Sequence, residues 1–185
     1  MEPFVLEEND CFDEIKKLYD ESFSSKLKIK NHIIKRRLKT KRYQNFLIFK
    51  NNQKIGFCLL ANLKQNLCHI DYLAIDKNFR GKGTGTEFMK FLILKLRDKI
   101  ITLECEDSLI SFYEKFGFII IKNDNYYSWG QKVNFMVLKR KYNIHNIHNI
   151  ILNFNNIKDL KPYINKIFSL IIYISYSLFY LFIPW

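Results

Sequence analysis

The chain of 185 residues is long enough for one compact domain with an appendage, and 48% of its residues are hydrophobic, enough to bury a core. Its formal net charge of +12 would suit an acidic partner such as nucleic acid or anionic lipid. The Lys excess, however, accompanies Asn, Ile, Phe and Tyr, which are all encoded by AT-rich codons, so we attribute much of it to genome composition and not to an acidic partner. Its cysteines form no C-x-x-C pair and have no His at metal-ligand spacing, so we expect reduced thiols in an intracellular protein without a metal.

The chain begins with short strands and two amphipathic helices. Its acidic N-terminus, MEPFVLEEND, lacks the cationic start and apolar run of a secretory signal, so we expect a cytoplasmic protein. An apolar stripe recurs at helical spacing from Phe12 to Phe23, and Asn51-Asn52-Gln53 marks a hairpin turn. The elements predicted for this half are strand 3–7, helices 10–24 and 31–41, and strands 44–50 and 54–63.

The second half alternates strands and helices. A glycine-rich loop at 80–85 stands between a strand and a long helix, and Gly117 is suited to end the next helix. The predicted elements are strand 67–76, helix 86–97, strand 100–105, helix 108–116 and strands 118–122 and 132–139. Together with the first half they predict an α+β fold around a mixed sheet.

The composition changes after Tyr142. We divide the chain into a folded domain at 1–142, a low-complexity basic linker at 143–166 and a hydrophobic segment at 167–185. The last segment carries no charge, is about as long as a helix that spans a bilayer, and follows lysines as on a cytosolic side. It therefore predicts a membrane tail anchor. The alternatives are a helix packed on the domain or through a dimer, and an extension without function.

The most informative segment is DYLAIDKNFRGKGTGTE at 71–87, a strand that runs into a loop with three glycines and then a helix. Glycines let the backbone approach a ligand, and the N–H groups of the loop and the helix dipole together form an anion site. Arg80 and Lys82 add positive charge to its rim. The segment lacks the G-x-x-x-x-G-K-[ST] pattern of nucleoside triphosphatases and the G-x-G-x-x-G pattern of dinucleotide-binding folds.

Two segments carry a resemblance to a known family. Arg80, Gly83 and Gly85 fit [RQ]-x-x-G-x-[GA], and SFYEKFGF at 111–118, about 30 residues further on, is similar to a helix that reads L-Y-x-K-x-G-F. In this order and context they resemble the Gcn5-related N-acetyltransferase (GNAT) superfamily over residues 3–140. For the loop alone, the alternative is an ordinary glycine-rich turn.

The resemblance implies an acyl-CoA N-acyltransferase fold: a mixed, mostly antiparallel sheet with flanking helices, in which a parallel strand pair, 67–76 and 100–105, splays apart. It implies acetyl-CoA as the co-substrate and no metal. The pantetheine arm is expected to pair with backbone groups of Leu73, Ala74 and Ile75, as an added strand would. The pyrophosphate is expected on the loop residues Arg80, Gly81, Lys82, Gly83, Thr84, Gly85 and Thr86.

The resemblance also implies a direct reaction, in which a primary amine attacks the thioester in a ternary complex and a backbone N–H stabilises the oxyanion. Tyr113 matches the family tyrosine that protonates the leaving thiolate; the alternative is a packing aromatic or a CoA contact. Glu104 and Asp71 are the candidates for the general base, with His69 on the face of Asp71, although many members use water. Only residues 105–108 separate Glu104 from the helix of Tyr113, fewer than usual.

The sequence does not name the acceptor. In the family, the two N-terminal helices and the last β–β loop line the acceptor site. Here the region 26–42 is strongly basic, which suits an acidic acceptor or a solvated helix face, and the aromatic loop with Tyr126, Tyr127 and Trp129 suits a small-molecule pocket or packing on the core. We expect an enzyme. The other functions considered are a non-catalytic acyl-CoA sensor and, last in rank, a basic nucleic-acid-binding protein. The oligomeric state is left open.

Overall fold

The structure is a computed structural model, and it describes residues 4–8, 12–25, 28, 30–41, 43–62, 66–122, 127–128 and 131–138. These residues belong to one compact unit, Met1–Arg140. The predicted linker and the predicted tail anchor lie outside the described residues, as do Tyr126 and Trp129 of the aromatic loop. No helix within the described part is long and apolar enough to cross a membrane.

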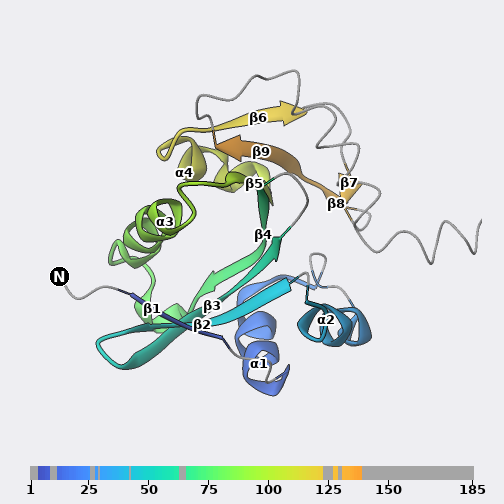
Figure 1. Cartoon of the computed structure of the whole chain (residues 1–185), viewed down its shortest axis with the longest axis vertical. Coiled ribbons are helices and arrows are strands. Elements are labelled where there is room, and N and C mark those ends of the chain that lie inside the picture. Colours follow the sequence, from blue (N-terminus) through green and yellow to red (C-terminus); the bar gives the residue numbers. More distant parts are fainter. Residues whose placement is uncertain are drawn as a thin grey trace, which may run out of the picture. The chain divides into compact units, whose positions relative to one another are not determined.

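Helices and strands follow one another in the predicted order (Figure 1). The strands are β1 (Val5–Glu8), β2 (Tyr43–Lys50), β3 (Gln53–Asn62), β4 (Leu67–Ile75), β5 (Ile100–Cys105), β6 (Phe118–Lys122), β7 (Tyr127–Ser128), β8 (Gln131–Lys132) and β9 (Asn134–Leu138). The α-helices are α1 (Phe12–Ser22), α2 (Asn31–Leu38), α3 (Thr84–Lys95) and α4 (Ile110–Glu114), with 3₁₀ turns η1 (Lys77–Phe79) and η2 (Asp107–Leu109).

One mixed sheet runs through the unit, with the strand order β1-β2-β3-β4-β5-β9-β6. Its neighbouring strands are antiparallel except β4 and β5, which run parallel. The short strands β7 and β8 form a separate hairpin. This mixed, mostly antiparallel sheet with flanking helices confirms the predicted fold class.

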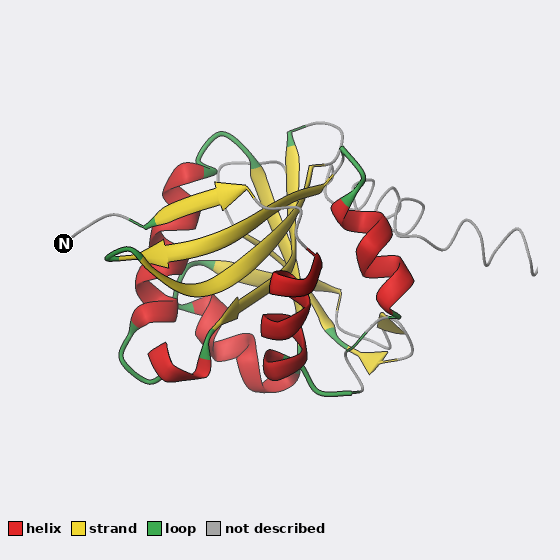
Figure 2. Cartoon of the chain, turned by 90° about the horizontal axis from the view of Figure 1, so that it is seen from below, coloured by secondary structure: helices red, strands yellow, loops and turns green. Residues whose placement is uncertain are grey.

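Helices cover both faces of the sheet (Figure 2). Successive side chains of a strand point to opposite faces. In β4, Leu73 and Ile75 therefore pack with α3 and α4, whereas Ala74 packs with α1 and α2. The helices present matching apolar stripes, whose burial supplies most of the favourable free energy of folding. These stripes are Phe88, Met89 and Leu92 of α3, and Ile15, Leu18, Tyr19, Ile33, Ile34 and Leu38 of α1 and α2.

Several boundaries differ from the prediction, and three of these differences have a local reason. Helix α3 begins before residue 86, because Gly83 adopts the left-handed conformation, with φ of 79°, and serves as its N-cap. The helix predicted at 108–116 starts as the 3₁₀ turn η2 before it becomes α4. The strand predicted at 132–139 is interrupted at Val133, so β8 pairs with β7 and only β9 joins the main sheet.

Candidate active site

The parallel strands β4 and β5 lie side by side only over their first halves. Their register ends where Ile70 lies opposite Leu103, although both strands continue beyond that point. We call the diverging ends the fork; it comprises residues 71–75 of β4 and 104–105 of β5. One edge of β4 therefore has no strand partner at the fork among the described residues.

A β-bulge in β4 coincides with the start of the fork. Against β3, Ile70 pairs with Leu60 and Tyr72 pairs with Leu59, which leaves Asp71 as an extra residue in β4. A bulge bends its strand and increases the local twist. This bend accounts for the separation of β4 from β5, and Asp71 is the residue at which the fork opens.

The open edge of β4 presents backbone groups to the fork. The N–H of Asp76 donates to the carbonyl oxygen of Ile55 in β3 at 2.7 Å, so the Ile75 carbonyl of the same planar peptide points away from β3. By the alternation of a strand, the N–H of Ile75 and both groups of Leu73 also face the fork, whereas those of Ala74 face β3. Of the three residues predicted to pair with pantetheine, Leu73 and Ile75 thus offer backbone groups and Ala74 does not.

The glycine-rich loop leads from β4 into α3. Asp76 begins it by accepting a hydrogen bond from the N–H of Asn78 at 2.8 Å, which caps η1. Gly81 and Gly83 have φ of 76° and 79°, a region that residues with a Cβ rarely adopt. From Gly81 to Thr86, no N–H group donates to a backbone acceptor within the described chain. With the dipole of the twelve-residue α3 behind them, these groups are suited to bind an anion.

The two cations of the loop differ in their surroundings. Lys82 is exposed beside the N–H groups. The backbone N–H of Arg80 donates to the carbonyl oxygen of Lys77 at 3.3 Å, inside η1. Its guanidinium turns toward the end of β4, where Nε donates to the Ile75 carbonyl oxygen at 2.6 Å and Nη2 donates to Ser22 Oγ of α1 at 2.9 Å. The N–H of Arg80 is therefore used within the fold, unlike those of the following residues.

Tyr113 lies on α4, on the face of the sheet that α3 also covers. Its ring packs edge to face on Phe112 and Phe118. Burial raises the pKa of Tyr113, and nearby Cys105 at the end of β5 raises it further, so the phenol keeps its proton at neutral pH. Phe112 also reaches the start of α3, because its Cζ lies 3.9 Å from the position of a Cβ on Gly85. The packing of α4 thus brings Tyr113 near Cys105 of the fork, and its neighbour Phe112 against the first turn of α3.

The connection from β5 to α4 is held by Asn134 of β9. Its Nδ2 donates to Oδ1 of Asp107 in η2 at 2.6 Å and lies 3.4 Å from the carbonyl oxygen of Cys105. Asn134 is only 4% exposed, and its contact with the Cys105 carbonyl is buried, whereas Asp107 lies at the surface. The two contacts fix the short segment 105–108 and with it the helix that carries Tyr113.

Glu104 lies at the end of β5, on the opposite face from Tyr113. Leu103 and Cys105 pack with α3 and α4, so the side chain of Glu104 between them points to the side of α1 and α2. Glu104 pairs in register with Phe135 of β9 and is half-buried. A base at Glu104 and an acid at Tyr113 would act from two sides of the sheet, with the fork between them.

Asp71 is held in an ion pair. Its carboxylate accepts a hydrogen bond from the guanidinium of Arg37 in α2. Arg37 is 1% exposed, and its guanidinium carbon lies 5.5 Å and 6.0 Å from the ring centroids of Tyr43 and Tyr72. Burial raises the pKa of Tyr72, and the charge of Asp71 raises it further, so this phenol stays neutral beside the pair. The ion pair ties α2 to the bulge of β4.

His69, the other polar residue predicted on this face, is a packing residue. Its Nδ1 lies 3.0 Å from Thr102 Oγ1 on the neighbouring strand, and its ring stacks on Phe135 with centroids 6.0 Å apart. Both His69 and Thr102 are buried. These contacts lie in the paired part of β4 and β5, before the fork opens.

A comparison with protein families agrees with this geometry. The model of the acetyltransferase (GNAT) family matches residues 9–118, more than half of the chain. The chain belongs to the GNAT acetyltransferase family. This membership confirms the resemblance read from the glycine loop and the Tyr113 segment, and with it the prediction of an acyltransferase enzyme.

Solved GNAT structures share the fold. A GNAT-family protein from Bacteroides thetaiotaomicron is 20% identical, with a TM-score of 0.71 over 84% of this chain and 97% of its own. The ribosomal-protein-S18-alanine N-acetyltransferase from Escherichia coli is 16% identical, with a TM-score of 0.59 over 73% and 92%. A GNAT family acetyltransferase from Elizabethkingia anophelis with acetyl-CoA bound is 19% identical, with a TM-score of 0.56 over 76% and 100%. No curated protein matches the chain in sequence.

Two residues that support this GNAT site were not predicted as site residues. The sequence contains a signal for Arg37, because this residue shares the apolar face of α2 with Ile33, Ile34 and Leu38. A charge on a buried face needs a buried partner. The sequence contains no signal for Asn134, because its role depends on the break between β8 and β9. Within the described residues, no group of three or more His, Cys, Asp or Glu could hold a metal ion.

Proposed function

We propose that this GNAT protein transfers an acetyl group from acetyl-CoA to a primary amine by direct attack in a ternary complex. The observation that carries the proposal is the fork of β4 and β5 beside a loop of N–H donors. The open strand edge suits pantetheine and the loop suits a diphosphate, in the order in which CoA carries these groups. The acetyl-CoA bound to the Elizabethkingia anophelis neighbour supports the choice of co-substrate.

In this proposal acetyl-CoA binds along β4. The N–H groups from Gly81 to Thr86 hold the diphosphate, and the exposed Lys82 adds a cation. The amides of pantetheine pair with the backbone of Leu73 and with the N–H of Ile75. This pairing directs the thioester along the fork toward the bulge of β4, where the strands begin to part.

The groups that take part in the proposed reaction reach the fork from both faces of the sheet. The amine enters from the side of α1 and α2, and its nitrogen forms a bond with the carbonyl carbon of the thioester. A backbone N–H on the open edge stabilises the oxyanion until the C–S bond breaks. Tyr113 donates its proton to the leaving thiolate, and Glu104, directly or through water, accepts the proton of the amine. We assign no proton transfer to Asp71, because its carboxylate holds Arg37.

Calorimetric titration of the full chain with acetyl-CoA tests the proposal. Gly83→Glu would place a carboxylate and a strained residue in the anion site, because Gly83 has φ of 79°. We expect saturable binding by the wild type and affinity at least about 100-fold weaker in the variant, because like charges repel at the site. Asn66→Glu is the matched control. Asn66 also has a positive φ, 58°, and precedes β4 at the end opposite the loop.

Loss of affinity in Gly83→Glu, with affinity retained in Asn66→Glu, would support the loop as the diphosphate site. A folded wild type that does not bind acetyl-CoA would overturn the proposed activity. A Gly83→Glu variant that binds as tightly as the wild type would overturn the assignment of the loop.

A further inference from the structure

Arg80 connects three elements of the candidate site. Its Nε donates to the carbonyl oxygen of Ile75, the last residue of β4, at 2.6 Å. Its Nη2 donates to Oγ of Ser22, the last residue of α1, at 2.9 Å. Its backbone N–H closes η1. Arg80 thus joins the open strand edge and α1 through its side chain, and the start of the loop through its backbone.

The contact with Ile75 falls at the border between the strand edge and the loop. The Ile75 carbonyl faces the fork, and after it the chain turns into η1. A ligand that pairs with the strand edge and also reaches the loop must pass this point. With the Arg80 guanidinium on Ile75, the next fork-facing carbonyl along β4 belongs to Leu73.

The guanidinium of Arg80 donates to oxygens of β4 and α1, outside the glycine-rich loop. Both of its acceptors are neutral oxygens, and the N–H groups from Gly81 to Thr86 have no backbone acceptor within the described chain. The exposed Lys82 stands beside those groups as a second cation. A lysine at position 80 could not reproduce both contacts, because a guanidinium donates in two fixed directions and an ammonium is a single point of charge.

We propose that Arg80 is a positioning residue that fixes the entry of the pantetheine track and the end of α1 relative to the loop, and that its guanidinium does not bind the diphosphate. This inference rests on the proposed function, because the track is that of acetyl-CoA. Without the Arg80 contacts, the end of β4 and the end of α1 would have to be ordered when the ligand binds, which costs affinity. The affinity is lowered for ligands that pair with the strand edge and is unchanged for ligands that bind only the loop.

Two ligands separate these contributions in calorimetric titrations of the full chain. CoA carries pantetheine, whereas 3′-phosphoadenosine 5′-diphosphate is the same nucleotide with its diphosphate but without pantetheine. We expect Arg80→Gln and Arg80→Lys to weaken CoA about tenfold, the effect of one charge-assisted hydrogen bond, and to change the affinity for the fragment less than about twofold. Lys82→Gln is the comparison, and it should weaken both ligands because its charge lies beside the anion site.

A double-variant cycle tests the connection to α1. Ser22→Ala should weaken CoA about threefold. The double variant with Arg80→Gln should be no weaker than Arg80→Gln alone, because both residues act through one contact. The contacts lie at the surface, so the variants are expected to fold, which circular dichroism checks.

The outcomes separate this inference from the proposed function. Equal weakening of both ligands by Arg80→Gln, with recovery in Arg80→Lys, would make Arg80 a charge for the diphosphate and overturn the inference. Additive losses from Arg80→Gln and Ser22→Ala would overturn the connection to α1. A wild type that binds neither ligand would overturn the proposed function, and the inference with it.

Discussion

Tyr113 is the side chain on which the proposed chemistry can be tested most directly. Burial and the neighbouring Cys105 raise its pKa, so the phenol holds the proton that a leaving thiolate needs. Tyr113→Phe removes this proton and keeps the ring that packs on Phe112 and Phe118. We expect kcat to fall about 100-fold while the affinity for acetyl-CoA stays unchanged. Release of free CoA with a panel of primary amines measures the rate.

The matched control is Tyr19→Phe, a buried tyrosine of α1 that should leave kcat unchanged. Because the pKa of Tyr113 is raised, the phenol should stay protonated up to about pH 10. Its ionisation should therefore not reduce the wild-type rate at any pH below that value. An unchanged rate in Tyr113→Phe would contradict the role as an acid. Weaker acetyl-CoA binding at an unchanged kcat would make Tyr113 a CoA contact instead.

Residue types and spacing were sufficient to predict the loop, because glycines at positive φ before a long helix have few other uses. They were not sufficient for the side chains and backbone groups of β4. The extra residue at Asp71 shifts which groups face the fork, and nothing in the run LCHIDYLAID reveals a bulge. Leu73, Ala74 and Ile75 were predicted together as pantetheine contacts, although the backbone groups of Ala74 face β3. The contact between Arg80 and Ser22 joins distant parts of the sequence and could not be predicted from local spacing.

One buried ion pair, between Arg37 and Asp71, links helix α2 to strand β4 in addition to their apolar contacts. Arg37→Met would leave the carboxylate of Asp71 buried without its counter-charge. We expect this change to lower the free energy of unfolding by about 3–5 kcal/mol. Adding Asp71→Asn to it removes the uncompensated charge, so the double variant should recover part of the loss. Urea denaturation of the full chain measures both changes.

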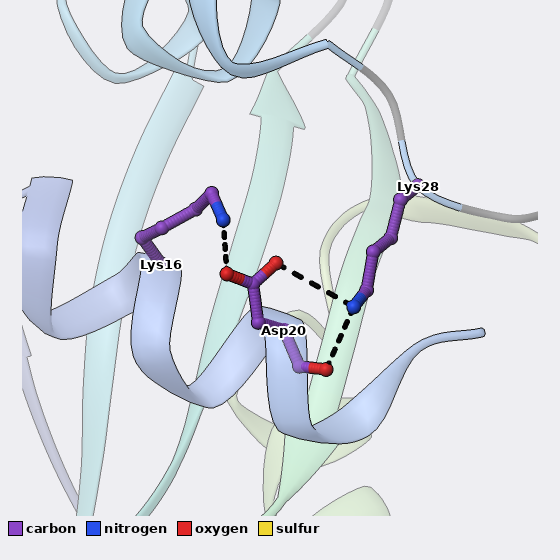
Figure 3. A network of polar contacts seen from close by, with 3 residues as sticks. All are labelled: Lys16, Asp20 and Lys28. Atoms are coloured by element: carbon purple, nitrogen blue, oxygen red, sulfur yellow. Dashed lines mark hydrogen bonds and ion pairs between the residues drawn. The ribbon is translucent and has the colours of Figure 1, made fainter. Parts of the chain in front are cut away.

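An exposed ion pair in α1 provides the control (Figure 3). Lys16 and Lys28 both contact Asp20; the hydrogen bond from Lys16 holds the pKa of Asp20 below its usual value, and Nζ of Lys28 donates to the Asp20 carbonyl oxygen at 2.8 Å. Water screens these charges, so Lys16→Met should cost less than about 1 kcal/mol. Equal losses from Lys16→Met and Arg37→Met would contradict the importance of burial. A double variant less stable than Arg37→Met alone would contradict the ion-pair explanation.

Hydrophobic periodicity predicted the order of helices and strands, because each element has one face to bury. It could not predict where β4 and β5 separate, since residues 67–76 are similarly apolar in the paired and in the open part. Close contacts between strands are equally invisible in a sequence. Gly56 of β3 is an example, because a Cβ there would lie 2.2 Å from the carbonyl oxygen of Ala74.

Buried thiols make the stability of the whole domain sensitive to alkaline pH. Burial raises the pKa of Cys68 to about 11 and that of Cys105 to about 12, and it raises that of Cys58 well above its usual value. Well below the ordinary thiol pKa of about 8.5, both the folded and the unfolded state keep these protons, so the stability contribution is complete. As the pH rises toward the folded pKa values, the unfolded state releases its protons first. The free energy of unfolding should then fall by up to about 1.4 kcal/mol per pH unit for each thiol.

The net charge of the chain also changes in this pH range, and this change has the opposite effect on the free energy of unfolding. The chain carries +12 at pH 7, and its lysines lose protons from about pH 10, so mutual repulsion weakens and stability would rise. About 1 M salt separates the two contributions, because it shortens the Debye length to about 3 Å without reaching a buried thiol. Urea titrations between about pH 8 and pH 10 should therefore show a steeper loss of stability at high salt than at low salt. Cys68→Ala should reduce that loss of stability by the contribution of one thiol. A free energy of unfolding that rises with pH at high salt, or a slope that Cys68→Ala leaves unchanged, would contradict buried thiols as the cause.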